Sequence, residues 1–153
     1  MDPQILNLKV LLQLPMFADV NGGDLDALAP YFQRKRWEAS ATLFKEGEAC
    51  HEFVFLITGR VSIQRRNMAG NLTEIAQLGP HDALGESGFL DNSIRTNRAI
   101  ALEPVDGLVM SQQVLDQLTL ANPSLANQLL KVLNHSLAQK LRKINAEFIE
   151  FKR

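Results

Sequence analysis

Residues 79–101, which read GPHDALGESGFLDNSIRTNRAIA, contain the pattern that decides the fold. Glycine, proline, aspartate and asparagine punctuate this stretch, and these residues mark turns because of their backbone preferences. Between them the chain changes from extended to helical and back again. The stretch therefore predicts a turn at Gly79-Pro80, a short strand that ends at Gly85, one helical turn over residues 86–90, and an extended segment over residues 94–101.

The helical turn after Gly85 suggests a binding site. Its first backbone N–H groups have no partner within the turn, and such groups attract an anion, phosphate above all. Arg95 and Thr96 follow the turn, and a guanidinium and a hydroxyl donate hydrogen bonds to phosphate oxygens. The carboxylate of Glu86 has the wrong charge for phosphate, so we expect it to accept hydrogen bonds from sugar hydroxyls. Together these groups predict a site for a sugar phosphate or nucleotide.

A plainer interpretation exists for each of these residues. Glu86 and Arg95 would form an ion pair that holds the loop closed, and an exposed pair contributes little. Gly85 and Gly88 would only permit tight turns, and Thr96 would be an ordinary strand residue. We prefer the binding interpretation because all of them occur together at this spacing.

The stretch also resembles the phosphate-binding cassette of the cyclic nucleotide-binding domain, found in catabolite activator and FNR-type regulators and in cyclic nucleotide-dependent kinases and channels. The family pattern is Gly-Pro-x-Asp-x-hydrophobic-Gly-Glu followed, after a loop, by Arg-Ser/Thr-Ala. Here Gly79-Pro80, Asp82 and Gly85-Glu86 match, and Arg95-Thr96 stand nine residues after Glu86. Upstream, FKEGE at residues 44–48 and FVFLITGRV at residues 53–61 resemble the family's first hairpin. The resemblance covers about residues 11–151.

This resemblance implies a ligand, cAMP or cGMP, and a role for each matching residue. Glu86 would accept from the ribose 2′-hydroxyl, Arg95 would pair with the cyclic phosphate, and the backbone N–H groups after Gly85, at Ser87 among others, would share that phosphate. Thr96 resembles members that respond to cGMP as well as cAMP. The sequence departs from the family pattern at several positions, and none of the departures removes the Glu or the Arg: Ala39-Ser40 before the first hairpin, and Ala83, Ser87, Ile94 and Asn97 in the cassette.

Composition and length restrict the class of protein. The 153 residues carry a net charge of −1 and are 46% hydrophobic, which predicts one domain of a soluble protein rather than a generic nucleic-acid surface. The single cysteine, Cys50, excludes an internal disulfide, and we expect a cytoplasmic protein with an incidental thiol in a polar loop. No apolar run approaches the ~20 residues that cross a bilayer, so we expect no membrane association.

Hydrophobic periodicity predicts a mainly β protein with flanking helices. Short, closely spaced segments with no helical crossovers point to a jelly roll, or double-stranded β-helix, which can enclose one small ligand. We expect a single domain over residues 1–153, with N-terminal helices in 1–33, a barrel in 34–110 that includes the cassette at 79–99, and helices in 111–153. The expected strands are residues 36–38, 42–45, 53–58, 60–65, 72–78, 82–85, 95–102 and 106–110. The expected helices are residues 4–14, a short one around 25–32, 112–120 and a long one from Pro123 to the end.

The long helix from Pro123 carries an apolar seam at heptad spacing: Leu137, Leu141, Ile144, Phe148 and Phe151. This seam would pack on the barrel or on the same helix of a second copy, and we favour a homodimer for its distal part. At about two heptads the seam is marginal by itself. The resemblance implies that this helix covers the base of the nucleotide. It makes Arg142, Ile144 and Asn145 candidates to face the purine.

The chain shows no basic recognition helix after this seam, so we expect no direct DNA binding by this chain. The initial Met suggests a natural N-terminus, and the Phe-Lys-Arg end fits either a stand-alone sensor or a cut between sensor and effector. We therefore expect a regulatory module that binds a cyclic nucleotide and signals through its last helix to a partner or effector domain. The alternative is a dimeric sensor or scaffold of the same fold, often the N-terminal part of a transcription regulator, that has lost nucleotide binding or uses another effector such as haem.

Catalysis is not expected. His51, His81 and His135 are scattered, no His-x-His pair lies on one strand, and one cysteine cannot hold an iron–sulfur cluster. No Ser-His-Asp or Cys-His arrangement is apparent, and no metal site is expected.

Overall fold

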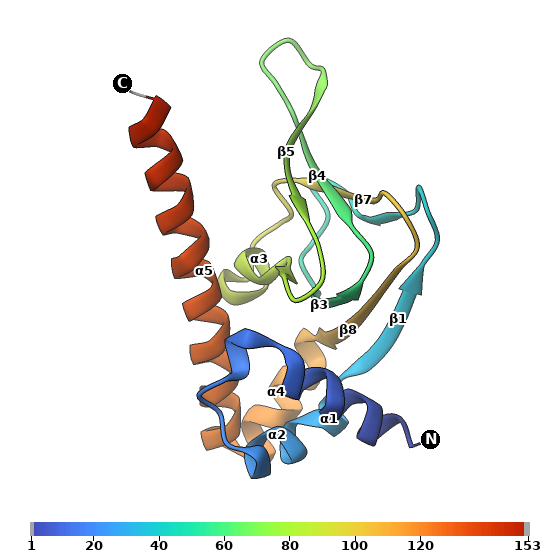
Figure 1. Ribbon diagram of the computed structural model, residues 1–153, viewed down its shortest axis with the longest axis vertical. Coiled ribbons are helices and arrows are strands. Elements are labelled where there is room, and N and C mark those ends of the chain that lie inside the picture. The colour runs from blue at the N-terminus through green and yellow to red at the C-terminus, as the bar shows by residue number, and fades with distance from the viewer. Residues whose placement is uncertain (1, 152–153) are drawn as a thin grey trace.

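The computed structural model describes residues 2–151, so the expectations about Met1 and about the terminal Lys-Arg lie outside the described residues. Figure 1 shows a β-barrel with short helices packed beneath it and one long helix running along its side. A small helix, α3 (Glu86–Asp91), lies between the barrel and the long helix (Figure 1). The cassette predicted from the sequence therefore lies where barrel and long helix meet.

The barrel consists of two four-stranded antiparallel sheets. One sheet has the order β1-β8-β3-β6 and the other β2-β7-β4-β5, so most neighbours in space are distant in sequence. This arrangement confirms the predicted jelly roll. The strands are β1 (Gln33–Trp37), β2 (Thr42–Phe44), β3 (Glu52–Thr58), β4 (Val61–Arg66), β5 (Leu72–Leu78), β6 (Ala83–Leu84), β7 (Arg98–Ala101) and β8 (Val105–Ser111).

The helices begin where polar side chains cap them. Asn21 accepts from the backbone N–H of Asp24, and Ser111 accepts from that of Val114, as N-cap residues do. Asn122 caps the long helix in the same way, and Pro123 fills its first position. The helices are α1 (Pro3–Gln13), α2 (Gly22–Leu28), α3 (Glu86–Asp91), α4 (Gln112–Ala121) and α5 (Pro123–Phe151), with short 3-10 turns at Pro15–Phe17 and Ala29–Tyr31.

Two strands begin three residues away from their predicted starts, and the other strand boundaries agree to within one residue. β7 begins at Arg98 rather than at Arg95, because Arg95 turns its side chain into the interior and residue 94 forms an isolated bridge to Ala49. β1 begins at Gln33 rather than at Arg36. The prediction missed its first residues because the first four are exposed and polar and show no apolar alternation. Pairing with β8 over the whole segment makes it a strand all the same.

The apolar interior forms two clusters. One fills the space between the two sheets and includes Trp37, Leu56 and Val61. The other lies between the base of the barrel and the helices, and its centre is a group of rings in edge-on contact: Phe17, Phe32, Phe53, Phe55 and Phe89. Edge-on aromatic pairs are favourable beyond the area that they bury. The second cluster joins the cassette helix to the helical base.

The β4–β5 hairpin extends beyond the rest of the barrel (Figure 1). Residues 72–77 of β5 are exposed, and β5 is an edge strand that pairs with β4 alone. The hydroxyl of Ser62 on β4 donates to the Glu74 carboxylate at 2.6 Å, which holds the pKa of that carboxyl below its usual value. Strand β5 lies on the side of the hairpin nearer to α5 (Figure 1).

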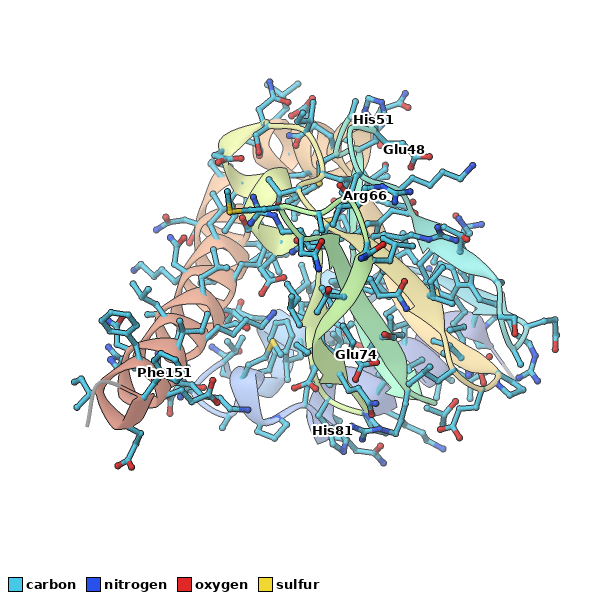
Figure 2. The ribbon with its side chains drawn as sticks, turned by 90° about the horizontal axis from the view of Figure 1, so that it is seen from above. Glu48, His51, Arg66, Glu74, His81 and Phe151 are labelled. Atoms are coloured by element: carbon cyan, nitrogen blue, oxygen red, sulfur yellow. The ribbon has the colours of Figure 1, made fainter. Side chains whose placement is uncertain are left out.

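Helix α5 has two unlike halves. Up to Ser136 it buries one face, through residues such as Leu125, Leu129 and Leu133, against the helical base and the barrel. From Leu141 onward every described residue is exposed. Figures 1 and 2 show this half standing clear of the sheets, with Phe151 at its far end. None of the helices in residues 2–151 is long and apolar enough to cross a membrane.

Candidate ligand-binding site

A cavity of about 860 Å³ lies between the cassette, strand β5 and helix α5. This volume is within the range that holds small molecules. The cassette contributes Gly85, Glu86, Ser87, Arg95 and Thr96, five residues predicted from the sequence. Strand β5 contributes residues 75–78, and α5 contributes Leu137, Lys140, Leu141, Lys143, Ile144 and Glu147.

Arg95 is the buried cation of this cavity, with 7% of its surface exposed. Its guanidinium donates to the carbonyl of Glu52 at 2.7 Å and to that of Gly85 at 3.2 Å. The same group lies over the Phe44 ring, 4.1 Å from the ring centre. Within residues 2–151 the structure records no ion pair for Arg95. A charge that is buried without a counter-ion favours an anionic ligand, because burial removes its water.

Glu86 is buried too, but its cation is not Arg95. The side chain is 3% exposed, and one oxygen pairs with the ammonium of Lys140 on α5. The interpretation of Glu86 and Arg95 as a mutual ion pair is therefore not what the structure shows.

Gly85 allows the Arg95 guanidinium to lie against the backbone of the cassette. Its φ of +80° is in the left-handed region, which side chains rarely adopt. A Cβ atom at this position would also overlap the Arg95 guanidinium. Glycine is therefore needed here for two reasons: the left-handed backbone conformation, and the room that the Arg95 guanidinium occupies.

The structure does not bring Arg142 and Asn145 to the cavity. Both are exposed, and neither is among the residues that line it. A helix turns by about 100° per residue, so the neighbours Leu141 and Ile144 face the cavity while Arg142 and Asn145 point elsewhere. Sequence reasoning missed Lys140, Lys143 and Glu147. The apolar seam that begins at Leu137 could have predicted them, because residues three and four positions apart share a helix face.

Cys50 lies in the loop before β3, but its side chain is buried, which corrects the expectation of polar surroundings. It is 4% exposed beneath α3, and its thiol donates to the Gly85 carbonyl at 3.4 Å. Burial raises the pKa of the Cys50 thiol, and the nearby Arg95 guanidinium offsets part of this effect. The thiol is therefore protonated at neutral pH and acts as a packing group under the site.

The histidines lie apart from one another. Figure 2 shows His51 and His81 at opposite sides of the barrel, and both are exposed. In the described part of the chain, no group of three or more His, Cys, Asp or Glu is placed to hold a metal ion. The only charged groups buried in the cavity wall are thus Glu86 and Arg95, within residues 2–151.

Comparison with known proteins identifies relatives of this chain. The family described as "Cyclic nucleotide-binding domain" matches residues 34–122, which is more than half of the chain. This segment contains the barrel, the cassette and α4.

Two curated relatives carry cAMP in their names. The "CRP-like cAMP-activated global transcriptional regulator" of Mycobacterium tuberculosis is 29% identical over 137 residues, which cover 90% of this chain and 59% of that protein. The "Cyclic AMP receptor protein" of Thermus thermophilus is 26% identical over 133 residues, which cover 87% of this chain and 60% of that protein. The chain thus spans about three fifths of the length of the curated relatives that it matches.

A solved structure supports the fold. The crystal structure of a cyclic nucleotide-binding domain from Methylobacillus flagellatus aligns with a TM-score of 0.84 at 23% identity. The alignment covers 96% of this chain and 83% of that one. At this level of identity the likeness concerns the architecture alone.

Proposed function

Because the chain belongs to the cyclic nucleotide-binding domain family, we propose that its cavity binds a cyclic nucleotide, cAMP or cGMP, and that α5 transmits binding to a partner or effector domain. The observation that carries this proposal is the buried Arg95 guanidinium, which has no counter-ion in residues 2–151 and lines a cavity beside a buried carboxylate. A small molecule with an anionic group and a hydroxyl group would provide a partner for Arg95 and for Glu86, respectively.

In this proposal the cyclic phosphate lies against Arg95, where a planar fork of N–H donors can hold two phosphate oxygens. Thr96 adds a hydroxyl donor, and the backbone N–H groups from Gly85 to Ser87 share the negative charge. Glu86 accepts from the ribose 2′-hydroxyl. We favour cAMP because the relatives from M. tuberculosis and T. thermophilus are named for it.

The base would then lie toward α5 rather than deeper in the barrel. Leu137, Leu141 and Ile144 provide an apolar surface on the cavity side of this helix. In place of Arg142 and Asn145, we propose Lys143 and Glu147 as the polar groups nearest to the purine edge. Contacts that differ between two positions of α5 would allow the ligand to shift the population of the helix.

The output of the chain is regulatory in this proposal, not catalytic. The three segments 1–33, 34–110 and 111–153 act as a single sensory domain in the cytoplasm. We further propose a homodimer through Leu137, Leu141, Ile144, Phe148 and Phe151, of which the last four are more than half exposed. The M. tuberculosis relative is named a transcriptional regulator, and both curated relatives are longer than this chain. In this proposal residues 1–153 themselves do not contact DNA.

Calorimetric titration with cAMP and cGMP tests the ligand, and the Arg95→Lys variant tests the site. Lysine keeps the charge but loses the fork that contacts phosphate in two places. Charge-assisted hydrogen bonds contribute about 1.5–3 kcal/mol, so we expect the Kd to rise between about tenfold and about a hundredfold. The exposed Arg34→Lys variant on β1 is the matched control and should bind like the wild type. Equal affinity of Arg95→Lys and wild type would exclude this site, and no binding by the wild type would exclude the function.

A further inference from the structure

The ammonium of Lys140 is held by two acceptors of the cassette. It pairs with the carboxylate of Glu86, and it donates to the carbonyl of Ala83 at 2.7 Å. The Glu86 side chain is 3% exposed, whereas that of Lys140 is 36% exposed. The lysine therefore reaches from the surface of α5 to a carboxylate that solvent hardly touches.

Lys140 also occupies a particular place along α5. The residues before it include the last buried position of the helix, Ser136, and every described residue after it is exposed. In the described part of the chain, the contact with Glu86 is the one ion pair that joins α5 to the barrel. The pair thus lies at the junction between the docked half and the exposed half of the helix.

The same carboxylate is the group that our proposed function assigns to the ribose hydroxyl. Lys140 lines the cavity together with Glu86, so its ammonium stands where a ligand must approach. A hydroxyl cannot displace an ammonium from a buried carboxylate without cost, because the buried carboxylate then loses its counter-ion. Binding would therefore have to exchange one partner of Glu86 for another.

We propose that Lys140 is an internal competitor of the ligand, which occupies Glu86 in the empty protein and is released when the ribose hydroxyl takes its place. This inference rests on the proposed function, and it deepens that function in two respects. It makes Lys140 a residue that sets ligand affinity and the preference for a ribose over a 2′-deoxyribose. It also couples occupation of the cavity to loss of the ion pair that joins α5 to the cassette.

The Lys140→Met variant tests this competition, because methionine keeps the apolar stem and removes the ammonium. We expect the Kd for cAMP to fall at least about fivefold, the lower end of the usual coupling between two sites. The Kd for 2′-deoxy-cAMP should stay unchanged, since this ligand has no hydroxyl to exchange with Lys140. A general structural effect of the substitution would change the affinities for both ligands alike. Unchanged or weaker binding of cAMP to the variant, beside normal binding to the wild type, would overturn the competition.

Two further variants control for the loss of a positive charge and for the role of the Glu86 carboxylate. Arg142→Met removes a cation from the same helix at an exposed position outside the cavity, and it should leave both affinities unchanged. Glu86→Gln should weaken cAMP binding, and in that background the Lys140→Met change should have no further effect, because there is no carboxylate left to free. This double variant also leaves no buried carboxylate without its cation, so it remains informative if Lys140→Met alone unfolds.

Hydrogen exchange of α5 without ligand gives a second readout. Lys140→Met and Glu86→Gln both break the pair, so both should speed amide exchange in α5, although they change cAMP affinity in opposite directions. Slow exchange in both variants would overturn the coupling to the helix. Failure of the wild type and of Lys140→Met to bind any cyclic nucleotide would instead overturn the proposed function.

Discussion

At the scale of single residues, the site depends on how closely Gly85 lets the Arg95 guanidinium approach the backbone. The guanidinium donates to the Gly85 carbonyl, and the absence of a Cβ atom gives it room. The Cys50 thiol donates to the same carbonyl from below. One backbone group thus receives two buried donors, and a change at Gly85 alters the environment of both.

The Gly85→Ala variant is expected to lose both stability and ligand binding. The left-handed backbone conformation costs a non-glycine residue about 1–2 kcal/mol, and the new methyl group would displace Arg95 from its position. Urea unfolding measures the first effect, and calorimetry with cAMP measures the second.

Gly70→Ala is the matched control for this change. Gly70 has a φ of +85° in the β4–β5 hairpin, and a Cβ there would have no atom within 4 Å. It should lose a similar amount of stability from the backbone and bind cAMP normally. Normal binding by Gly85→Ala would contradict the proposed position of Arg95 in the site.

At the scale of elements, α3 is too short to be stable by itself, because a helix of six residues is less than two turns. It is held by Phe89, which is 2% exposed and whose ring lies 4.7 Å from the centre of the Phe53 ring on β3. Gly88 in the same helix lies directly over Cys50. The position of Glu86 therefore depends on packing beneath the helix.

Phe89→Ala should destabilise the protein by about 3–5 kcal/mol, as removal of a buried ring does. Because α3 loses its anchor, we also expect amide exchange at residues 86–91 to accelerate and cAMP binding to weaken. Leu120→Ala serves as the control, since Leu120 is 87% exposed on α4 and its truncation should cost less than about 0.5 kcal/mol. Loss of stability without faster exchange in α3 would mean that another contact holds the cassette helix.

At the scale of the whole molecule, the barrel and the helical base share one core, but the distal half of α5 stands outside it. Leu141, Ile144, Phe148 and Phe151 leave a row of apolar side chains on this half. Exposed apolar surface of this extent marks an interaction site. The proposed homodimer would bury that row against the same row of a second copy.

Phe148→Glu should convert the dimer into a monomer, because a charge would be buried at the seam without a partner. Sedimentation velocity over a dilution series measures the oligomeric state directly. Asn145→Glu adds the same charge to an exposed position of α5 that is not part of the apolar row, and it should leave the dimer intact. A wild-type protein that sediments as a monomer at every concentration would exclude the proposed interface.

The sequence by itself determined the jelly roll, the order of its elements, and the presence of Gly85, Glu86, Arg95 and Thr96 at one cavity. These features depend on local patterns: alternation for strands, capping residues for helices, and glycine where the backbone turns sharply. Such signals act over a few residues, so they can be recognised in the linear chain. The strand boundary at Arg98 was missed because the Arg95 side chain turns inward, which no local pattern announces.

Only the tertiary structure decided which groups the site residues contact. Glu86 pairs with Lys140, a residue 54 positions away, and not with Arg95 in its own segment. The rotation of α5 determines that Lys140, Lys143 and Glu147 line the cavity, whereas Arg142 and Asn145 do not. The packing of α3 places Cys50 in the interior. Partner choice between distant elements depends on how whole helices and sheets pack together, and a shift of one residue along a helix turns a side chain by about 100°.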